Sequence, residues 1–161
     1  MKFTLRLWLV ILLSVSLMAC GFHLRGAADV SFNTIYIQGS TVIISKALKK
    51  NLTLNSVKVL DNAEGAELLL EIVGEESEKR ILSLAGTGKV NEFELYYRVH
   101  YRTRLSGDAL WSQVQTVEAR RDYSYSDTEL LAKQGEEKRL NEDMQSSVLN
   151  GLVRRLSALK K

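Results

Sequence analysis

The sequence predicts one α+β domain, a two-layer sandwich in which two helices pack on one face of a mostly antiparallel mixed sheet of about four strands. Three observations carry this prediction. Polar and apolar residues alternate along residues 93–105, as in a strand with one buried face. An apolar stripe with helical spacing runs along residues 140–159. The segments also follow one another in the order strand, helix, several strands and long helix.

The first 19 residues have the layout of a secretory signal peptide. Lys2 and Arg6 give a positive start, an apolar run spans residues 7–17, and small residues follow it. The run is too short for a typical membrane-spanning helix, which needs about 20 apolar residues. A retained anchor helix and a buried cysteine at position 20 are the alternatives.

Cys20 is the only cysteine in the chain and lies at the expected cleavage site. The ending Leu17-Met18-Ala19-Cys20 resembles the lipobox of bacterial lipoprotein precursors, in which the cysteine becomes the first residue and carries acyl chains such as palmitate. Gly21 follows the cysteine at the position where an aspartate would commonly signal retention in the inner membrane, so we expect sorting to the outer membrane. The sequence therefore predicts a signal peptide at 1–19, an acylated tether at 20–30 and a single domain at 31–161.

The composition gives no support for nucleic-acid binding. Residues 1–19 hold two basic residues and no acidic ones, so their removal lowers the formal net charge from +3 to about +1. One cysteine cannot form a disulfide within the chain, and acylation would consume it. The remaining residues are enough for one domain with a hydrophobic core of its own.

The first half of the domain reads as a strand, a helix and further extended segments. Residues 31–38 are rich in strand formers and end at Gly39. Ser40 or Thr41 is suited to cap a helix whose apolar residues recur at helical spacing: Ile43, Ile44, Ala47, Leu48 and Leu52.

Extended segments follow at residues 57–60 and 67–73. Residues 80–84 continue the second segment beyond an acidic bulge, and residues 86–88 form a turn. The bulge contains Glu75, Glu76 and Glu78, which we interpret as a bulged edge or a solvated turn rather than a general acid and base.

The alternating segment at 93–105 pairs with residues 111–123 across a turn at 106–108. We predict the register in which the apolar residues of both strands share one face. A shift of one residue would set Arg98 against Val117 and mix the faces. The preferred register pairs Leu105 with Trp111, Val99 with Val117, Arg98 with Glu118 and Tyr97 with Ala119.

The last element is a long amphipathic helix. Ser126 and Glu129 have the spacing of a capping box, and Asp127 adds negative charge at the positive end of the helix dipole. A helix that covers the sheet explains its apolar stripe more simply than a coiled coil does. The stripe consists of Leu140, Met144, Val148, Leu152, Leu156 and Leu159, widened by Leu149 and Val153.

A family resemblance covers essentially the whole mature chain. Cys20-Gly21-Phe22-His23-Leu24-Arg25, directly after a lipobox, resembles the mature start of the lipopolysaccharide-assembly lipoproteins of the LptE (RlpB) family. The order of the elements is similar, and so is the passage from Arg121-x-Tyr123-x-Tyr125 into Leu131-Ala132-Lys133. The resemblance implies a lipoprotein that is anchored in the outer membrane, plugs the lumen of the LptD β-barrel, helps that barrel assemble and binds lipopolysaccharide.

Lipopolysaccharide carries phosphates, which Lys and Arg side chains bind. Lys133 matches the lysine of the family's Ala-Lys segment, at an exposed position in the first turn of the last helix, and Lys89 lies beside the central turn. Many members have an arginine in that turn, whereas this chain reads Ala85-Gly86-Thr87-Gly88-Lys89. Arg98, Arg102 and Arg104 form a row on one strand face, either as a ligand site, as a surface against the barrel or as a solvated face in which Arg98 pairs with Glu118.

Three tyrosines are candidates for a partner interface: Tyr96, Tyr123 and Tyr125. Tyr96 alternates to the polar face, and the other two end the last strand, where an exposed tyrosine presents an apolar body and a polar tip. The simpler alternative is that some of these tyrosines only cover the edge of the sheet.

The sequence does not predict an enzyme, a metal site or a cofactor. His23 and His100 lack an arrangement with Ser and Asp, no Gly-x-Ser-x-Gly motif is present, and no His or Cys cluster has metal-ligand spacing. The alternative to a barrel partner is a free lipid or small-molecule carrier on the periplasmic side, which would need a sizeable apolar cavity.

Overall fold

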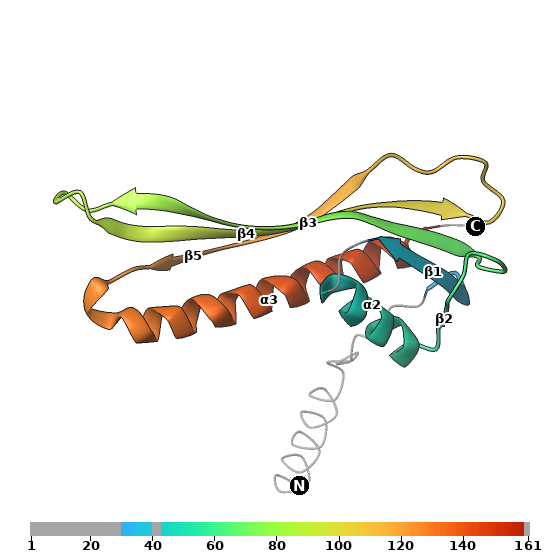
Figure 1. Cartoon of the computed structure of the whole chain (residues 1–161), viewed down its shortest axis with the longest axis horizontal. Helices are drawn as coiled ribbons and strands as arrows, with labels where there is room; N and C mark the ends of the chain where they lie inside the picture. The colour runs from blue at the N-terminus through green and yellow to red at the C-terminus, as the bar shows by residue number, and fades with distance from the viewer. Residues whose placement is uncertain (1–29, 40–42, 160–161) are drawn as a thin grey trace, which may run out of the picture.

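The computed structural model describes residues 30–39 and 43–159. The predicted signal peptide, Cys20, most of the tether and the helix cap at Ser40 or Thr41 lie outside these residues. The elements are β1 (Thr34–Gly39), α2 (Ile43–Leu54), β2 (Lys58–Leu60), β3 (Leu68–Leu84), β4 (Val90–Leu105), β5 (Gln115–Ser124), the short 3₁₀ turn η1 (Asp127–Glu129) and α3 (Leu130–Ser157) (Figure 1).

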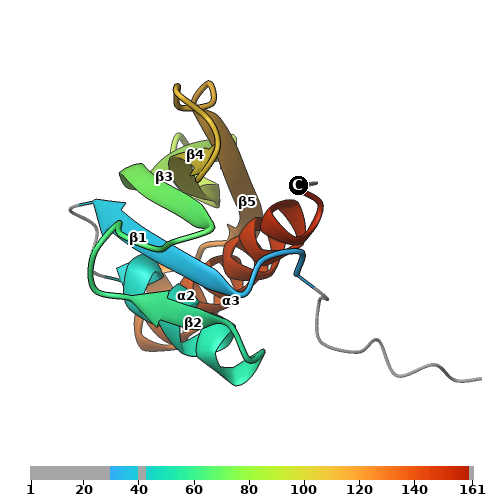
Figure 2. The same cartoon turned by 90° about the vertical axis from the view of Figure 1, so that its right-hand side faces the viewer.

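The strands form one mixed sheet in the order β2-β1-β3-β4-β5. β1 pairs in parallel with β2 and β3, whereas β3–β4 and β4–β5 are antiparallel. The sheet has five strands rather than about four, because the three-residue segment β2 also joins β1. Both helices lie on the same side of the sheet (Figures 1 and 2), which confirms the predicted two-layer α+β sandwich.

The core lies between the helices and the inner face of the sheet. Its buried side chains come from both helices and from every strand except β2. Those that are almost completely buried include Ile35, Ile44, Leu48, Leu68, Leu70, Val99, Met144, Val148, Leu152 and Leu156. The α3 residues of this set belong to the predicted stripe, and Leu140, Leu149 and Leu159 pack against the core while partly buried. Burial of these side chains stabilises the fold by roughly 2 kcal/mol for each large one.

The predicted register of β4 and β5 is confirmed. Arg98 lies opposite Glu118, Val99 opposite Val117 and Tyr97 opposite Ala119. β5 starts at Gln115, however, so Trp111 precedes the strand and does not pair with Leu105 within the sheet. The segment between the strands folds back as a loop, in which Ser112 N donates a hydrogen bond to Thr103 O at 2.8 Å.

β3 and β4 extend beyond β1 and β2 as a long hairpin arm, along which β5 pairs with β4, and the arm reaches the end where α3 begins (Figure 1). The expected acidic bulge is wrong in position. The irregularities in pairing lie between Ile72 and Gly74 and between Ile81 and Leu84, whereas the acidic residues belong to regularly paired strand. Glu75 faces the helices, where its carboxylate accepts hydrogen bonds from Tyr97 Oη at 2.6 Å and from Ile44 N at 3.5 Å.

The predicted capping box is also wrong. Ser126 precedes η1 rather than α3, and it makes no side-chain hydrogen bond that caps either helix. Its hydroxyl lies 2.8 Å from the Thr128 hydroxyl instead. The extra 3₁₀ turn displaces the start of α3 to Leu130, so the spacing from Ser126 to Glu129 no longer matches the first turn of that helix.

Candidate functional site

The arginine row on the outer face of β4 is covered by carboxylates from its neighbours. Arg98 donates to Glu118 of β5 and, at 3.1 Å, to Glu78 of β3, and Arg102 donates to Glu71. Hydrogen bonds to Glu118 and Glu78 raise the pKa of Arg98, while those from Arg80 and Arg98 lower the pKa of Glu78. A phosphate at Arg98 or Arg102 would have to displace these carboxylates, so the structure favours an ionic surface there over a ligand site.

Arg104 differs from the rest of the row. Its guanidinium and that of Arg102 lie 5.3 and 5.1 Å from the ring of Trp111, which the loop after β4 brings back over the outer face. The Arg104 Nε is buried and has no hydrogen-bond partner among the described residues. Trp111 thus holds both arginines by cation–π contact.

The hairpin arm, the end of β5 and the start of α3 lie at the same end of the molecule (Figure 1). The contacts of Lys89 with η1 and of Lys133 with the end of β5 place both lysines there. Lys89 Nζ lies 3.5 Å from Asp127 Oδ2, which joins the arm to η1. Lys133 Nζ donates to Ser124 Oγ at 3.1 Å and to Glu136 Oε2 at 2.9 Å. We call this region the cationic end.

The two lysines differ in exposure. The side chain of Lys89 is 74% exposed, whereas that of Lys133 is only 14% exposed. The expectation that Lys133 is exposed is therefore wrong, because β5 ends close enough for Ser124 to accept its hydrogen bond. Two acceptors orient the ammonium group of Lys133, whereas the exposed Lys89 has one carboxylate, Asp127, within ion-pair distance.

Large apolar side chains are exposed on the elements that form this end, and sequence reasoning missed them. They are Ile81, Leu82 and Leu84 on β3 and Leu130 and Leu131 at the start of α3, with Leu131 84% exposed. Ile81 and Leu82 are consecutive apolar residues, and no β3 residue after Ile72 is buried, so this part of the strand has no buried side. This lack of alternation is a signal that sequence reasoning had available.

The candidate interface tyrosines have different environments. Tyr123 is buried, and its hydroxyl donates to Glu137 Oε2 at 2.7 Å, so the expected exposure of Tyr123 is wrong. Tyr125 is partly buried and contacts Phe93 edge-on at 5.1 Å. Tyr96 lies on the outer face, donates to Glu94 at 2.6 Å and stacks with Arg80 and Arg98.

A partly exposed ionic contact joins α3 to the arm. Lys79 Nζ lies 2.6 Å from Glu137 Oε2, the atom that also accepts from Tyr123, and 4.1 Å from the centre of the Phe93 ring. Burial disfavours the Glu137 carboxylate, but hydrogen bonds from Lys79 and Tyr123 outweigh it and lower the pKa of Glu137. These polar partners hold the first turns of α3, which precede most of the apolar stripe.

The described residues contain no cluster of three or more His, Cys, Asp or Glu side chains suited to hold a metal ion. None of the helices in the described part of the chain is both long enough and apolar enough to span a membrane.

Comparison with known proteins agrees with the fold. A model of the LptE lipopolysaccharide-assembly family matches residues 32–156. The LPS-assembly lipoprotein LptE of Pectobacterium atrosepticum is 26% identical over 159 residues, which cover 96% of this chain and 84% of that protein.

Two solved structures are similar as well. Lipoprotein B from Nitrosomonas europaea is 35% identical with a TM-score of 0.75, covering 86% of this chain and 91% of that one. The rare lipoprotein B from Shewanella oneidensis is 28% identical with a TM-score of 0.70, covering 78% and 95%.

These similarities place the chain among lipoproteins with a two-layer α+β domain. The chain belongs to the LptE lipopolysaccharide-assembly family. It is accordingly a lipoprotein of lipopolysaccharide transport and outer-membrane assembly, and it is not an enzyme.

Proposed function

We propose that the protein is anchored in the outer membrane through acylated Cys20, occupies the lumen of the LptD β-barrel as a plug and assembly partner, and binds lipopolysaccharide at the cationic end. The observation that carries the ligand part is the meeting of Lys89 and Lys133 with exposed apolar side chains at one end of the molecule. The intact mass of the Cys20 terminus tests the acylation.

The chemistry of the cationic end matches an amphiphile with phosphates. Charge-assisted hydrogen bonds from ammonium groups bind phosphate oxygens. Leu131 and the apolar residues of β3 offer surface for hydrocarbon beside those cations. Arg98 and Arg102 are not part of this proposal, because they lie opposite Glu76 and Glu71 of β3, away from the exposed apolar side chains at the end of that strand.

The outer face of the sheet supports a location in a barrel lumen. The interior of large outer-membrane barrels is polar. The outer face presents a dense set of ion pairs, among them Arg98 with Glu118 and Arg120 with Glu94. Such a surface suits contact with a polar wall better than contact with lipid. Tyr96, partly exposed on the same face, is the one candidate tyrosine that fits this interface.

The carrier alternative finds less support. A carrier needs an apolar cavity, whereas the space between the sheet and the helices is filled by core side chains such as Leu48, Leu152 and Leu156, none of which is exposed to solvent.

The ligand site is tested with Lys133→Gln, which removes the charge while keeping a polar side chain. We expect binding to immobilised lipopolysaccharide to fall at least about tenfold, because one charge-assisted contact contributes roughly 1.5–3 kcal/mol. Lys138→Gln, an exposed lysine on the same helix, is the matched control and should bind as the parent does. Equal affinity of the two variants would remove Lys133 from the site.

A further inference from the structure

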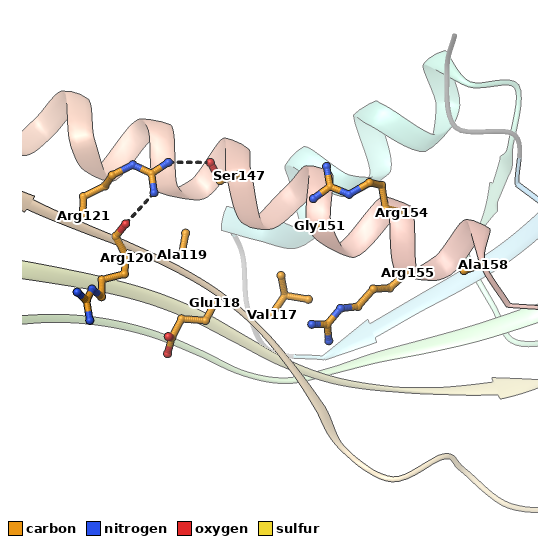
Figure 3. Close-up of a pocket in the computed structure, with 10 residues that line it drawn as sticks. All are labelled: Val117, Glu118, Ala119, Arg120, Arg121, Ser147, Gly151, Arg154, Arg155 and Ala158. Atoms are coloured by element: carbon orange, nitrogen blue, oxygen red, sulfur yellow. Dashed lines mark hydrogen bonds between the residues drawn. The ribbon is translucent and has the colours of Figure 1, made fainter. Parts of the chain in front are cut away.

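A groove of about 540 Å³ lies between β5 and the C-terminal half of α3 (Figure 3). β5 is an edge strand of the sheet, so one side of its backbone has no neighbouring strand. Val117 and Gly151 form the floor, where helix and strand approach closely: a Cβ at Gly151 would lie 2.9 Å from Val117 Cγ1. None of the residues assigned to lipopolysaccharide lines this groove.

The free edge of β5 offers backbone groups for pairing. The carbonyl groups of Thr116 and Arg120 face outward, since both accept hydrogen bonds from arginine side chains, Arg155 of α3 and Arg121 of β5. Backbone groups alternate in direction along a strand, so Glu118 and Asp122 also direct their N–H and C=O groups outward. Proteins commonly protect such an edge, because it is a template for another strand.

Arginine side chains donate to two of the outward carbonyls, those of Thr116 and Arg120. Arg155 Nη1 of α3 donates to Thr116 O at 2.8 Å. Arg121 Nη1 donates to Arg120 O at 2.7 Å (Figure 3). Arg154 folds toward the same groove, with Nη2 3.9 Å from the Cβ position of Gly151.

The groove is strongly cationic. Arg120, Arg121, Arg154 and Arg155 line it, against a single acidic residue, Glu118. Arg120 and Arg121 pair with Glu94 and Asp143. Arg154 and Arg155, both exposed, form no salt bridge with any described residue. The charge of the groove is therefore complementary to an acidic partner.

We propose that this groove binds an extended acidic segment of another polypeptide, which adds to the sheet as a strand along β5. A free strand edge beside a helix is the geometry of β-strand addition, in which main-chain hydrogen bonds give affinity and alternate side chains give specificity. The N–H groups of the incoming segment take over the carbonyls of Thr116 and Arg120. The guanidinium of Arg155, released by this exchange, then binds carboxylates of the segment together with Arg154.

The proposal is independent of the lipopolysaccharide site and of the barrel partner, and peptide probes test it directly. The full chain in detergent micelles is titrated with an eight-residue peptide of alternating Val and Glu and with one of alternating Val and Lys. Alternation puts every charge on one face of the added strand, toward α3. We expect the acidic peptide to bind and to slow amide hydrogen exchange at Glu118 and Asp122, and the basic peptide to have neither effect.

Variants separate pairing from simple charge attraction. Arg154→Glu combined with Arg155→Glu should weaken the acidic peptide at least tenfold. Glu118→Pro removes one outward N–H and should abolish the exchange protection, whereas Glu118→Ala, which loses the same carboxylate but keeps the N–H, should retain it. Binding of both peptides alike, binding without exchange protection, or no binding would each overturn the proposal and leave the arginines as protection of the edge alone.

Discussion

Gly39 ends β1 at a point where the backbone of β3 leaves no space for a side chain. Its φ is +125°, a conformation that residues with a Cβ rarely adopt, and a Cβ there would lie 2.3 Å from Ile72 O. The residue is exposed to solvent, so burial alone gives no warning that it is constrained.

We predict that Gly39→Ala lowers the free energy of unfolding by about 3 kcal/mol, because both strain and a backbone clash oppose the Cβ. Gly86→Ala is the matched control, since nothing lies within 4 Å of its added Cβ. Denaturant unfolding of both variants measures the difference. Equal stability of the two would show that β1 and β3 separate easily at this point.

At this scale the sequence predicts neighbours better than it predicts exposure. Pairing of Arg98 with Glu118 follows from the alternation of charge and hydrophobicity. The burial of Tyr123 was missed, although alternation from Val117 through Ala119 places Tyr123 on the same inner face. The Tyr123 hydroxyl can be buried because it donates a hydrogen bond to Glu137, a residue 14 positions away on another element.

α3 and the hairpin arm depend on each other at the scale of elements. The apolar stripe anchors the second half of α3, whereas the contact of Glu137 with Lys79 and Tyr123 anchors the first half. The pKa of Glu137 is lowered and that of Lys79 is raised in the folded state; burial opposes both charges, and their mutual hydrogen bond outweighs it.

The sign of the pH dependence follows from these directions. The lowered pKa of Glu137 gives stability that is present above its unfolded pKa of about 4.3 and is lost as the pH falls through the folded value. The raised pKa of Lys79 gives stability that is present below about 10.4 and is lost as the pH rises through the folded value.

We predict that Glu137→Gln destabilises the protein by about 1 kcal/mol or less between about pH 5 and 10, because both side chains remain partly exposed. The difference from the parent should shrink as the pH falls below the unfolded pKa of about 4.3, and it should vanish below the lowered folded pKa, where the parent carboxylate is protonated as well. Unfolding across this range measures it, with the exposed Glu142→Gln as control. A difference that does not change with pH would show that Glu137 acts through packing rather than charge.

The sequence predicts a helix or strand well where a pattern of apolar residues repeats over many positions. It predicts poorly where contacts between distant residues determine the local structure. The helical stripe from Leu140 and the register of β4 with β5 both rest on many consecutive residues. The start of α3 rests on the single pattern Ser126-x-x-Glu129, which the 3₁₀ turn overrides. The acidic residues of β3 suggest a bulge, because the sequence does not reveal that Arg98 of the neighbouring strand donates to Glu78 and Tyr97 donates to Glu75.

The whole molecule presents three surfaces of different chemistry. The cationic end offers lysines beside exposed apolar side chains, the outer sheet face is covered by ion pairs, and the β5 edge borders a groove lined by arginines. The family was recognisable from the sequence, whereas the separation of these surfaces needed the fold, because each combines segments that lie far apart along the chain.

The most direct test of the proposed function is purification of the tagged full-length protein from outer membranes in mild detergent, followed by mass identification of what accompanies it. We predict a large β-barrel of the LptD type in near-equal amount, because a plug inside a lumen stays with its barrel when lipid is removed. Recovery of the protein alone, acylated and monomeric, would contradict the role of a barrel plug.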